Sequence, residues 1–133
     1  MIITYDTDNL KKRLKTGFLV DEKMKFYSIY DFAYKYRTRI FNDKNEEVAY
    51  VEKDILQADK VDLFDRKGNR LDTILKIAEG YKSDEYLYEG DIDNGEIKDL
   101  FANTEGKLTI FDDKSLLFVI MFITGLAEMM RED

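Results

Sequence analysis

Ser115–Met130, SLLFVIMFITGLAEMM, is the stretch that decides the fold of this 133-residue chain. Its apolar side chains would cover every face of a helix, and a helix that is apolar all round must be buried all round, in a core or in lipid. The 13 residues from Ser115 to Ala127 carry no charge. They make about 20 Å of helix, whereas a bilayer core measures about 30 Å. The sequence therefore predicts a buried core helix over residues 115–131 and not a membrane span.

The composition indicates a globular protein and excludes several kinds of site. Hydrophobic residues make up 44% of the chain, with nine Tyr and nine Phe, and the length fits one domain, residues 1–133. Cysteine and histidine are both absent, which removes disulfides, thiolate zinc sites and the commonest general base. The net charge of −7 argues against nucleic-acid binding, because phosphate neutralisation needs a basic surface. We expect neither a metal site nor a cofactor.

The residues before the apolar stretch follow a strand pattern. From Phe18 to Ile110, aromatic and β-branched residues recur with period two between turn signals, which is typical of antiparallel strands. Gly95 and Gly106 would form hairpin turns as Asn-Gly and Glu-Gly pairs. The segment Thr7–Lys15 is a connector or a short helix. The expected strands are Met1–Asp6, Phe18–Asp21, Phe26–Tyr30, Tyr34–Phe41, Val48–Val51, Lys60–Asp65, Arg70–Ile77, Tyr86–Tyr88, Gly90–Ile92, Ile97–Phe101 and Lys107–Phe111.

One pattern occurs twice at an offset of 23 residues. The sequence IFNDK at 40–44 and the sequence LFDRK at 63–67 are each followed by apolar residues at matching positions. IFDDK at 110–114 begins in the same way but continues into the apolar stretch. The pattern indicates a repeated strand–turn–strand unit. The unit arises either by duplication or by convergence of short hairpins on the same turn chemistry.

Ten or eleven strands are enough to enclose a helix. A barrel of about eight strands fills its lumen with its own side chains, while a helix about 10–12 Å across needs a wider one. We therefore predict a mainly β fold, an antiparallel barrel of about 10–12 strands closed around the buried C-terminal helix.

The best candidate for a ligand site is a basic row on one predicted strand. Lys35, Arg37 and Arg39 alternate with residues that would face the core, so three cations would project from one side. Such a row can clamp a phosphate or a lipid head group. Alternatively, it is a solvated face whose cations pair with carboxylates of the next strand. Those carboxylates are Glu47, Glu52 and Asp54, and a second basic patch comprises Lys11, Lys12, Arg13 and Lys15.

Motifs for catalysis and for metal binding are weak. The segment Asp91–Ile97 is similar to the start of a calcium loop, but Gly95 is its fifth residue instead of its sixth, and Ala102 stands where the twelfth residue should be Glu. None of the three serines lies in a nucleophile elbow, and no phosphate-binding glycine loop is present. Without histidine and cysteine, catalysis would have to use carboxylates, Lys or Tyr. We assign no catalytic residue and no metal ligand.

Two hairpins and the terminal stretch together resemble a known superfamily. Thr38–Val51, Val61–Ile74 and Leu108–Met130, about 50 of the 133 residues, resemble the Tubby-like superfamily, specifically its small LURP-one-related group, which is similar to phospholipid scramblases. The resemblance implies an antiparallel barrel of nominally twelve strands around a C-terminal hydrophobic helix, although about 110 residues are few for twelve strands. Tubby proteins bind phosphoinositides through basic residues, but no such motif transfers residue by residue to this chain.

We expect a non-enzymatic binding or interaction module associated with an anionic lipid or its head group. Met1–Tyr5 is too short for the apolar region of a signal peptide, so we expect a cytoplasmic protein, at most peripheral to a membrane. One alternative is an acidic inhibitor or regulator that binds a protein through its negative surface. A second alternative is a carboxylate-based hydrolase.

Overall fold

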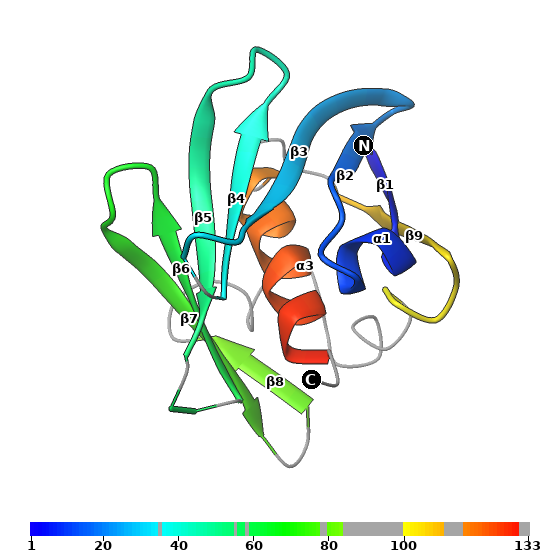
Figure 1. The fold of residues 1–133 in the computed structure, drawn as a ribbon. Helices are drawn as coiled ribbons and strands as arrows, with labels where there is room; N and C mark the ends of the chain where they lie inside the picture. Colours follow the sequence, from blue (N-terminus) through cyan, green and yellow to red (C-terminus); the bar gives the residue numbers. More distant parts are fainter. Residues whose placement is uncertain are drawn as a thin grey trace.

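A computed structural model describes residues 1–34, 36–54, 56–57, 59–77, 80–83, 100–110 and 116–130. In these ranges the chain forms nine strands in one sheet and two helices (Figure 1). The mainly β fold with a C-terminal helix is thus confirmed. The strands are β1 (Ile2–Asp6), β2 (Thr16–Val20), β3 (Lys23–Asp31), β4 (Arg37–Asn42), β5 (Glu47–Lys53), β6 (Lys60–Asp65), β7 (Arg70–Ile77), β8 (Gly80–Ser83) and β9 (Glu105–Thr109), and the helices are α1 (Thr7–Lys11) and α3 (Leu116–Met130).

The sheet is an antiparallel meander with one crossover. Its order is β8-β7-β6-β5-β4-β3-β2-β1-β9, so each strand from β1 to β8 lies beside its neighbour in the sequence, and β9 returns to pair with β1. Ile3 of β1 lies opposite Leu108 of β9 and opposite Val20 of β2. In the ranges given above, β8 and β9 are the two outer strands and do not pair with each other, so the described sheet is open.

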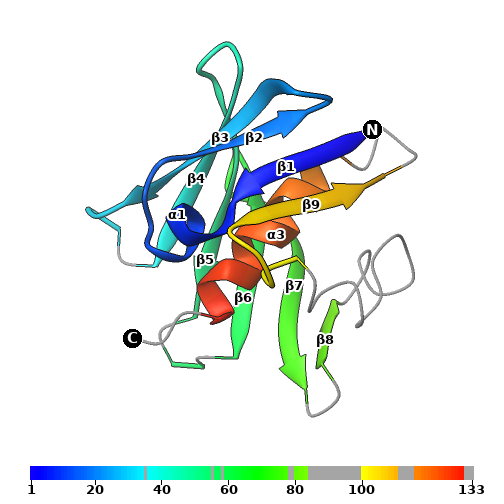
Figure 2. The ribbon, with the colours of Figure 1, turned by 90° about the vertical axis from the view of Figure 1, so that its right-hand side faces the viewer.

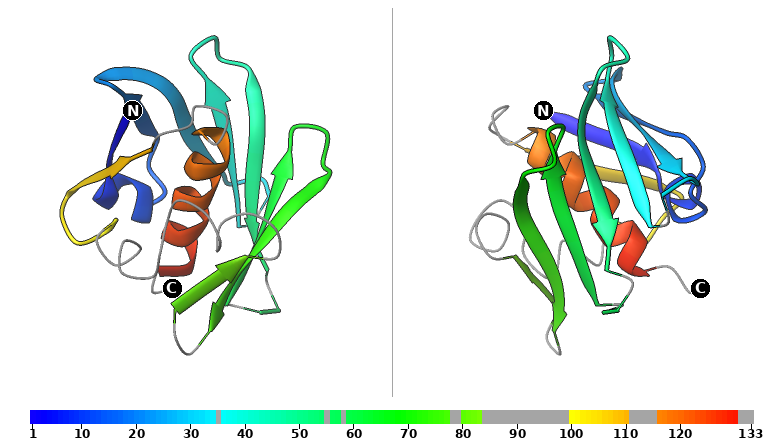
Figure 3. Two further views of the ribbon diagram at one scale, coloured as in Figure 1. Left: turned by 180° about the vertical axis from the view of Figure 1, so that it is seen from behind. Right: turned by 60° about the vertical axis from the view of Figure 1, so that its left-hand side comes forward.

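Helix α3 lies in the bend of this sheet. Strands β1 and β9 pass on one side of it and β5, β6 and β7 on the other (Figures 2 and 3). The eleven consecutive residues Val119–Met129 are buried, so the prediction of a helix buried on all faces is confirmed. Gly125 lets the helix lie close to β6 and β7, because a β-carbon there would lie 3.0 Å from Ile74 Cδ1 and 3.2 Å from Val61 Cγ1. Among the described residues, no helix is long and apolar enough to cross a membrane.

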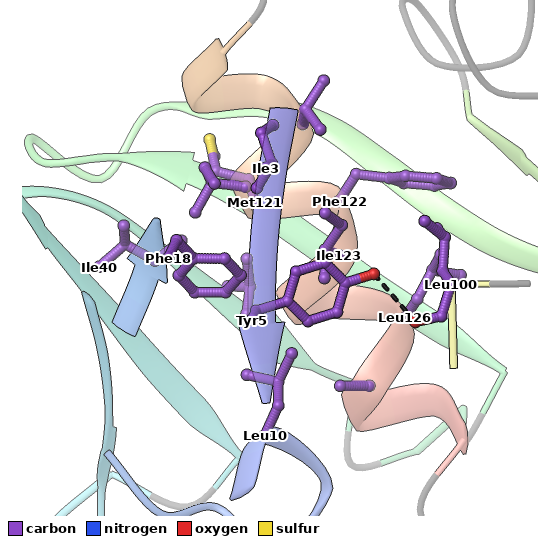
Figure 4. Close-up of a cluster of buried hydrophobic side chains, with 14 of the residues drawn as sticks. Ile3, Tyr5, Leu10, Phe18, Ile40, Leu100, Met121, Phe122, Ile123 and Leu126 are labelled. Atoms are coloured by element: carbon purple, nitrogen blue, oxygen red, sulfur yellow. Dashed lines mark hydrogen bonds between the residues drawn. The ribbon is translucent and has the colours of Figure 1, made fainter. Parts of the chain in front are cut away.

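The core is filled by the inward side chains of the strands and by α3 (Figure 4). Ile3, Tyr5 and Phe18 come from β1 and β2, and they pack with α3 residues such as Ile123. The Tyr5 hydroxyl donates a hydrogen bond of 2.9 Å to the Leu100 carbonyl. Burial raises the pKa of Tyr5. Tyr5 is therefore a neutral core residue whose one polar atom is satisfied.

The repeated unit corresponds to the β4–β5 and β6–β7 hairpins, which share three details at the 23-residue offset. Each has a register shift at the same position, after Ile40 in β4 and after Leu63 in β6. Asn42 and Asp65 each accept two backbone N–H groups of the following turn through Oδ1. The residue three positions later has a positive φ, +63° at Asn45 and +88° at Gly68, where Asn and Gly are favoured. The third copy of the pattern extends outside the described residues.

Three strand predictions need correction. β4 begins at Arg37, three residues later than expected, since Tyr36 has a φ of +69° and Tyr34 is an exposed turn residue. Gly106 lies inside β9 and not in a turn; its lack of a side chain makes room for the Tyr5 ring, whose Cε2 would lie 2.2 Å from a β-carbon. Strand β8 was not predicted. The expected strands 86–88 and 90–92, most of 97–101, the calcium-like segment and residues 115 and 131 of the expected helix lie outside the described residues.

Candidate binding surfaces

The predicted basic row lies on the outer side of β4. Thr38 and Ile40 are buried, and because side chains alternate along a strand, Arg37 and Arg39 project from the opposite face. The sequence therefore predicted the orientation of these two arginines. Lys35 lies outside the described residues.

Carboxylates surround both arginines. Arg37 pairs with Glu52 of the neighbouring β5. Arg39 donates from Nε to Asp31 Oδ2 at 2.7 Å and from Nη1 to Glu47 Oε1 at 2.8 Å. The hydrogen bond from Arg39 holds the pKa of Asp31 below its usual value. Three carboxylates thus face two guanidinium groups. Of the expected partners, Asp54 instead contacts Lys60 at 3.9 Å.

Two tyrosine rings lie against the same arginines. The Arg37 guanidinium carbon is 4.6 Å from the ring centre of Tyr34 and 4.2 Å from that of Tyr50, and Arg39 is 5.5 and 6.0 Å from the same two rings. We call Tyr34, Arg37, Arg39 and Tyr50 the Arg–Tyr cluster. Arg and Tyr are the side chains enriched at the energetic centres of protein interfaces. In this cluster Tyr34 is exposed, while Tyr50 is buried beneath the arginines.

The second basic patch lies on α1 and the turn that follows it. Asp6 caps the helix by accepting the Asn9 N–H at 2.9 Å. Lys11 and Lys15 lie over aromatic rings, Lys11 Nζ at 5.6 Å from the centre of Phe101 and Lys15 Nζ at 4.6 Å from the centre of Tyr27. Four basic side chains and one acidic side chain lie between residues 7 and 15, in a chain whose net charge is −7. This segment is the densest run of basic residues in the sequence.

One buried ion pair was not predicted from the sequence. Glu128 of α3 is 2% exposed. Its carboxylate accepts Arg13 Nη2 at 2.9 Å and Arg13 Nε at 3.3 Å, and Thr38 Oγ1 lies 3.5 Å away. The Arg13 guanidinium also lies 4.3 Å from the ring centre of Tyr30. A single charge inside an apolar helix was the signal for this site, but the sequence could not identify the partner, 115 residues away.

Two adjoining hollows lie on the outer face of β9, β1 and β2. They share Thr4 and Glu105; Asp6 and Gly17 line one, and Asp21 lines the other. Both are open depressions, and their carboxylates are partly engaged, since Asp21 accepts the Ile2 N–H at 2.9 Å. Within the described ranges, no group of three acidic side chains could hold a metal ion. The hollows offer no arrangement that identifies a reaction.

The carboxylates with shifted pKa values do not fit an acid catalyst. Hydrogen bonds from Arg39 and from Asn69 lower the pKa values of Asp31 and Asp65, respectively. A general acid at neutral pH needs the opposite shift. These two side chains are ionised partners in pairs and turns.

No family model, curated protein or solved structure matches this chain.

Proposed function

We propose that the protein is a non-enzymatic binding module that associates with an anionic lipid surface. The observation that carries this proposal is the separation of charge: three lysines, Lys11, Lys12 and Lys15, lie on α1 and its following turn in a chain of net charge −7. The fourth basic residue, Arg13, is paired with Glu128. Basic clusters of this kind are attracted to anionic lipid head groups, with about 1 kcal/mol for each Lys or Arg near the surface. The location that fits is the cytoplasmic face of a membrane, with the protein attached at its periphery.

The two basic patches are unequal candidates for this contact. A head group on Arg37 or Arg39 would have to displace three carboxylates. Lys12 and Lys15 are exposed, and Lys15 lies over the Tyr27 ring, so a lipid phosphate can approach these two at a smaller electrostatic cost. We propose that the segment 7–15 makes the main anionic contact, and that the row Lys35, Arg37 and Arg39 contributes less.

The fold proposed for this module is a barrel of about 10–12 strands of the Tubby-like, LURP-one-related kind. Three observations support it: the bend of the nine-stranded sheet around α3, the burial of Val119–Met129, and the matching β4–β5 and β6–β7 hairpins. The resemblance also motivates a lipid ligand, because Tubby proteins bind phosphoinositides.

Vesicle flotation tests the proposal. We expect wild-type protein to float with vesicles of phosphatidylcholine and phosphatidylserine at low salt and to be released as salt rises, since added salt screens the attraction between the lysines and the anionic head groups. Vesicles of phosphatidylcholine alone should bind little. Failure of the wild type to bind the anionic vesicles at low salt would refute the proposal.

Two matched charge-reversal variants distinguish the contributions of the two basic patches to vesicle binding. Lys11→Glu with Lys12→Glu and Lys15→Glu should abolish flotation, while Lys35→Glu with Arg37→Glu and Arg39→Glu should weaken it less. Cooperative thermal unfolding of both variants is the control for folding. The reverse ranking would assign the anionic contact to the β4 row.

A protein-binding regulator is the second candidate, and the Arg–Tyr cluster favours it. The cluster is held in place by Glu52, Asp31 and Glu47 and has the composition of an interface centre. A partner bound there would be lost on Tyr34→Ala with Tyr50→Ala but kept in the lysine variant of α1. Vesicle binding, in contrast, would be lost in the lysine variant of α1.

A further inference from the structure

We propose that one end of the sheet enters the lipid interface, and that it does so through exposed apolar side chains in the β1–β2, β3–β4 and β5–β6 connections. This inference rests on the proposed function and names the surface that carries it. Leu14, Phe32, Tyr34 and Leu56, which we call the apolar rim, lie in these three connections.

The topology places the three connections at one end of the sheet. In an antiparallel meander, alternate connections lie at the same end, so β1–β2, β3–β4 and β5–β6 share one end while β2–β3, β4–β5 and β6–β7 share the other. Figure 2 shows α1, the β3–β4 connection and the C-terminal end of α3 on one side, the left in that view, with the β4–β5 turn at the top. The connections of the opposite end are 21–22, 43–46 and 66–69, with the sequences DE, DKNE and RKGN. None of these three connections contains a large apolar residue.

The rim side chains are apolar but largely exposed to solvent. Phe32 is 81% exposed and Leu56 is 89% exposed. Together with Leu14 and Tyr34 they make four of the seven large hydrophobic residues that are exposed in the described part of the chain. Scattered single residues of this kind are normal on a soluble protein, but a group at one end indicates a contact surface.

Direct contacts join the connections into one surface. The Arg13 guanidinium lies 4.3 Å from the ring centre of Tyr30 and 5.7 Å from that of Tyr36, which ties the turn before β2 to the β3–β4 connection. Phe32 packs edge-on against Tyr30, with ring centres 4.8 Å apart. The Lys53 N–H donates to the Tyr36 carbonyl at 3.0 Å, and Leu56 follows in the next connection. These contacts tie the β1–β2 connection to the β3–β4 connection, and the β3–β4 connection to the end of β5.

The charges beside the rim select a lipid surface as the occupant. Lys15 directly follows Leu14 in the sequence, Lys12 lies in the turn before it, and Lys11 is the last residue of α1, in a chain that is otherwise acidic. Apolar tips next to cations match an interface in which hydrocarbon lies beneath anionic head groups. A single apolar anchor gives weak, reversible attachment, whereas an apolar group combined with a basic patch gives stable attachment. The rim and the segment 7–15 supply these two signals side by side.

The absence of tryptophan from the chain allows a direct test with a single introduced fluorophore. Phe32→Trp places it on the rim. Met24→Trp is the matched control, because Met24 is 49% exposed and lies beside the β2–β3 turn at the opposite end. The vesicles are phosphatidylcholine–phosphatidylserine with brominated acyl chains. We expect the emission of the Phe32→Trp protein to shift to the blue and to be quenched, and that of the Met24→Trp protein to show neither change.

The possible results separate this inference from the proposed function. Flotation of both fluorescent variants with an unshifted, unquenched spectrum for the rim variant would overturn the inference and leave the lipid-binding function standing. Failure of the wild type to float would overturn both. If the rim instead docks on a protein, the wild type should fail to float with the vesicles.

A second pair of variants separates the apolar contribution from the charged one. Phe32→Ser with Leu56→Ser should weaken vesicle binding about tenfold or more without changing how steeply binding falls with salt, since no charge is altered. The control Met24→Ser should bind like the wild type. Equal binding by the rim variant and the wild type would contradict the inference.

Discussion

Removing Arg13 should destabilise the protein strongly, although Arg13 lies in a turn. Arg13→Met removes all three guanidinium contacts to Glu128, at 2.9, 3.3 and 3.3 Å. Thr38 Oγ1 at 3.5 Å then remains as the other donor described for this carboxylate. The side chains of Arg13 and Glu128 are 15% and 3% exposed. Stranding a buried charge costs about 3–5 kcal/mol, which is a large part of the roughly 5–15 kcal/mol that stabilises a typical domain.

The double variant gives the decisive comparison. Arg13→Met with Glu128→Leu removes both charges and fills the space with apolar atoms, so its free energy of unfolding should lie within about 1–2 kcal/mol of the wild type, or above it. Arg13→Lys keeps the charge but loses the planar fork that contacts both carboxylate oxygens. Its loss of stability should be smaller than that of Arg13→Met.

The free energy of unfolding is measured by urea unfolding followed by circular dichroism. The proteins compared are the wild type, Arg13→Met, Glu128→Leu, the double variant and Arg13→Lys. A loss below about 1 kcal/mol for Arg13→Met would show that Glu128 is solvated or finds another partner, and would refute the reasoning. A double variant as unstable as the sum of Arg13→Met and Glu128→Leu would also contradict it, because the two sites would then be acting independently.

Three further predictions concern α3 and the outer face of β4. Ile120 is fully buried, so Ile120→Asn should lower the free energy of unfolding by about 3–5 kcal/mol and Ile120→Val by about 0.5–1.5 kcal/mol; equal, small losses in urea unfolding would place this face of the helix in solvent. Gly125→Val should cost about 1–3 kcal/mol or more by the same assay, because a β-carbon already meets Ile74 at 3.0 Å. Asp31 is held ionised by Arg39, so its NMR titration should give a pKa below the usual value that rises again in Arg39→Gln. Because that folded-state pKa is lowered, the stabilisation from this pair is present above the usual carboxyl range and is lost as the pH falls through the lowered pKa; a pKa unchanged by Arg39→Gln would contradict the pairing.

The sequence was sufficient where local patterns dictate structure. Period-two alternation located most of the strands, and it correctly placed Thr38 and Ile40 inside and Arg37 and Arg39 outside. The all-apolar stretch correctly indicated a buried helix, because no single face could be left in water.

What the sequence could not supply is contact between distant segments. The pairing of Asp31 with Arg39 depends on the register between β3 and β4. Gly106 was placed in a turn because Glu-Gly pairs favour turns, whereas its real requirement is space for the Tyr5 ring of a neighbouring strand. The apolar rim was missed for the same reason, since its members come from three connections that only the meander brings together.

Truncation tests most directly the central claim that α3 is the core around which the sheet bends. Deleting residues 115–133 would remove every buried side chain of Val119–Met129 and leave the inward faces of β1, β2, β5, β6 and β7 without cover. A chain that ends at Met130 and keeps the helix is the matched control. Thermal unfolding by circular dichroism should show a cooperative transition for the control and none for the truncated chain. A soluble, cooperatively melting protein without residues 115–133 would contradict this architecture.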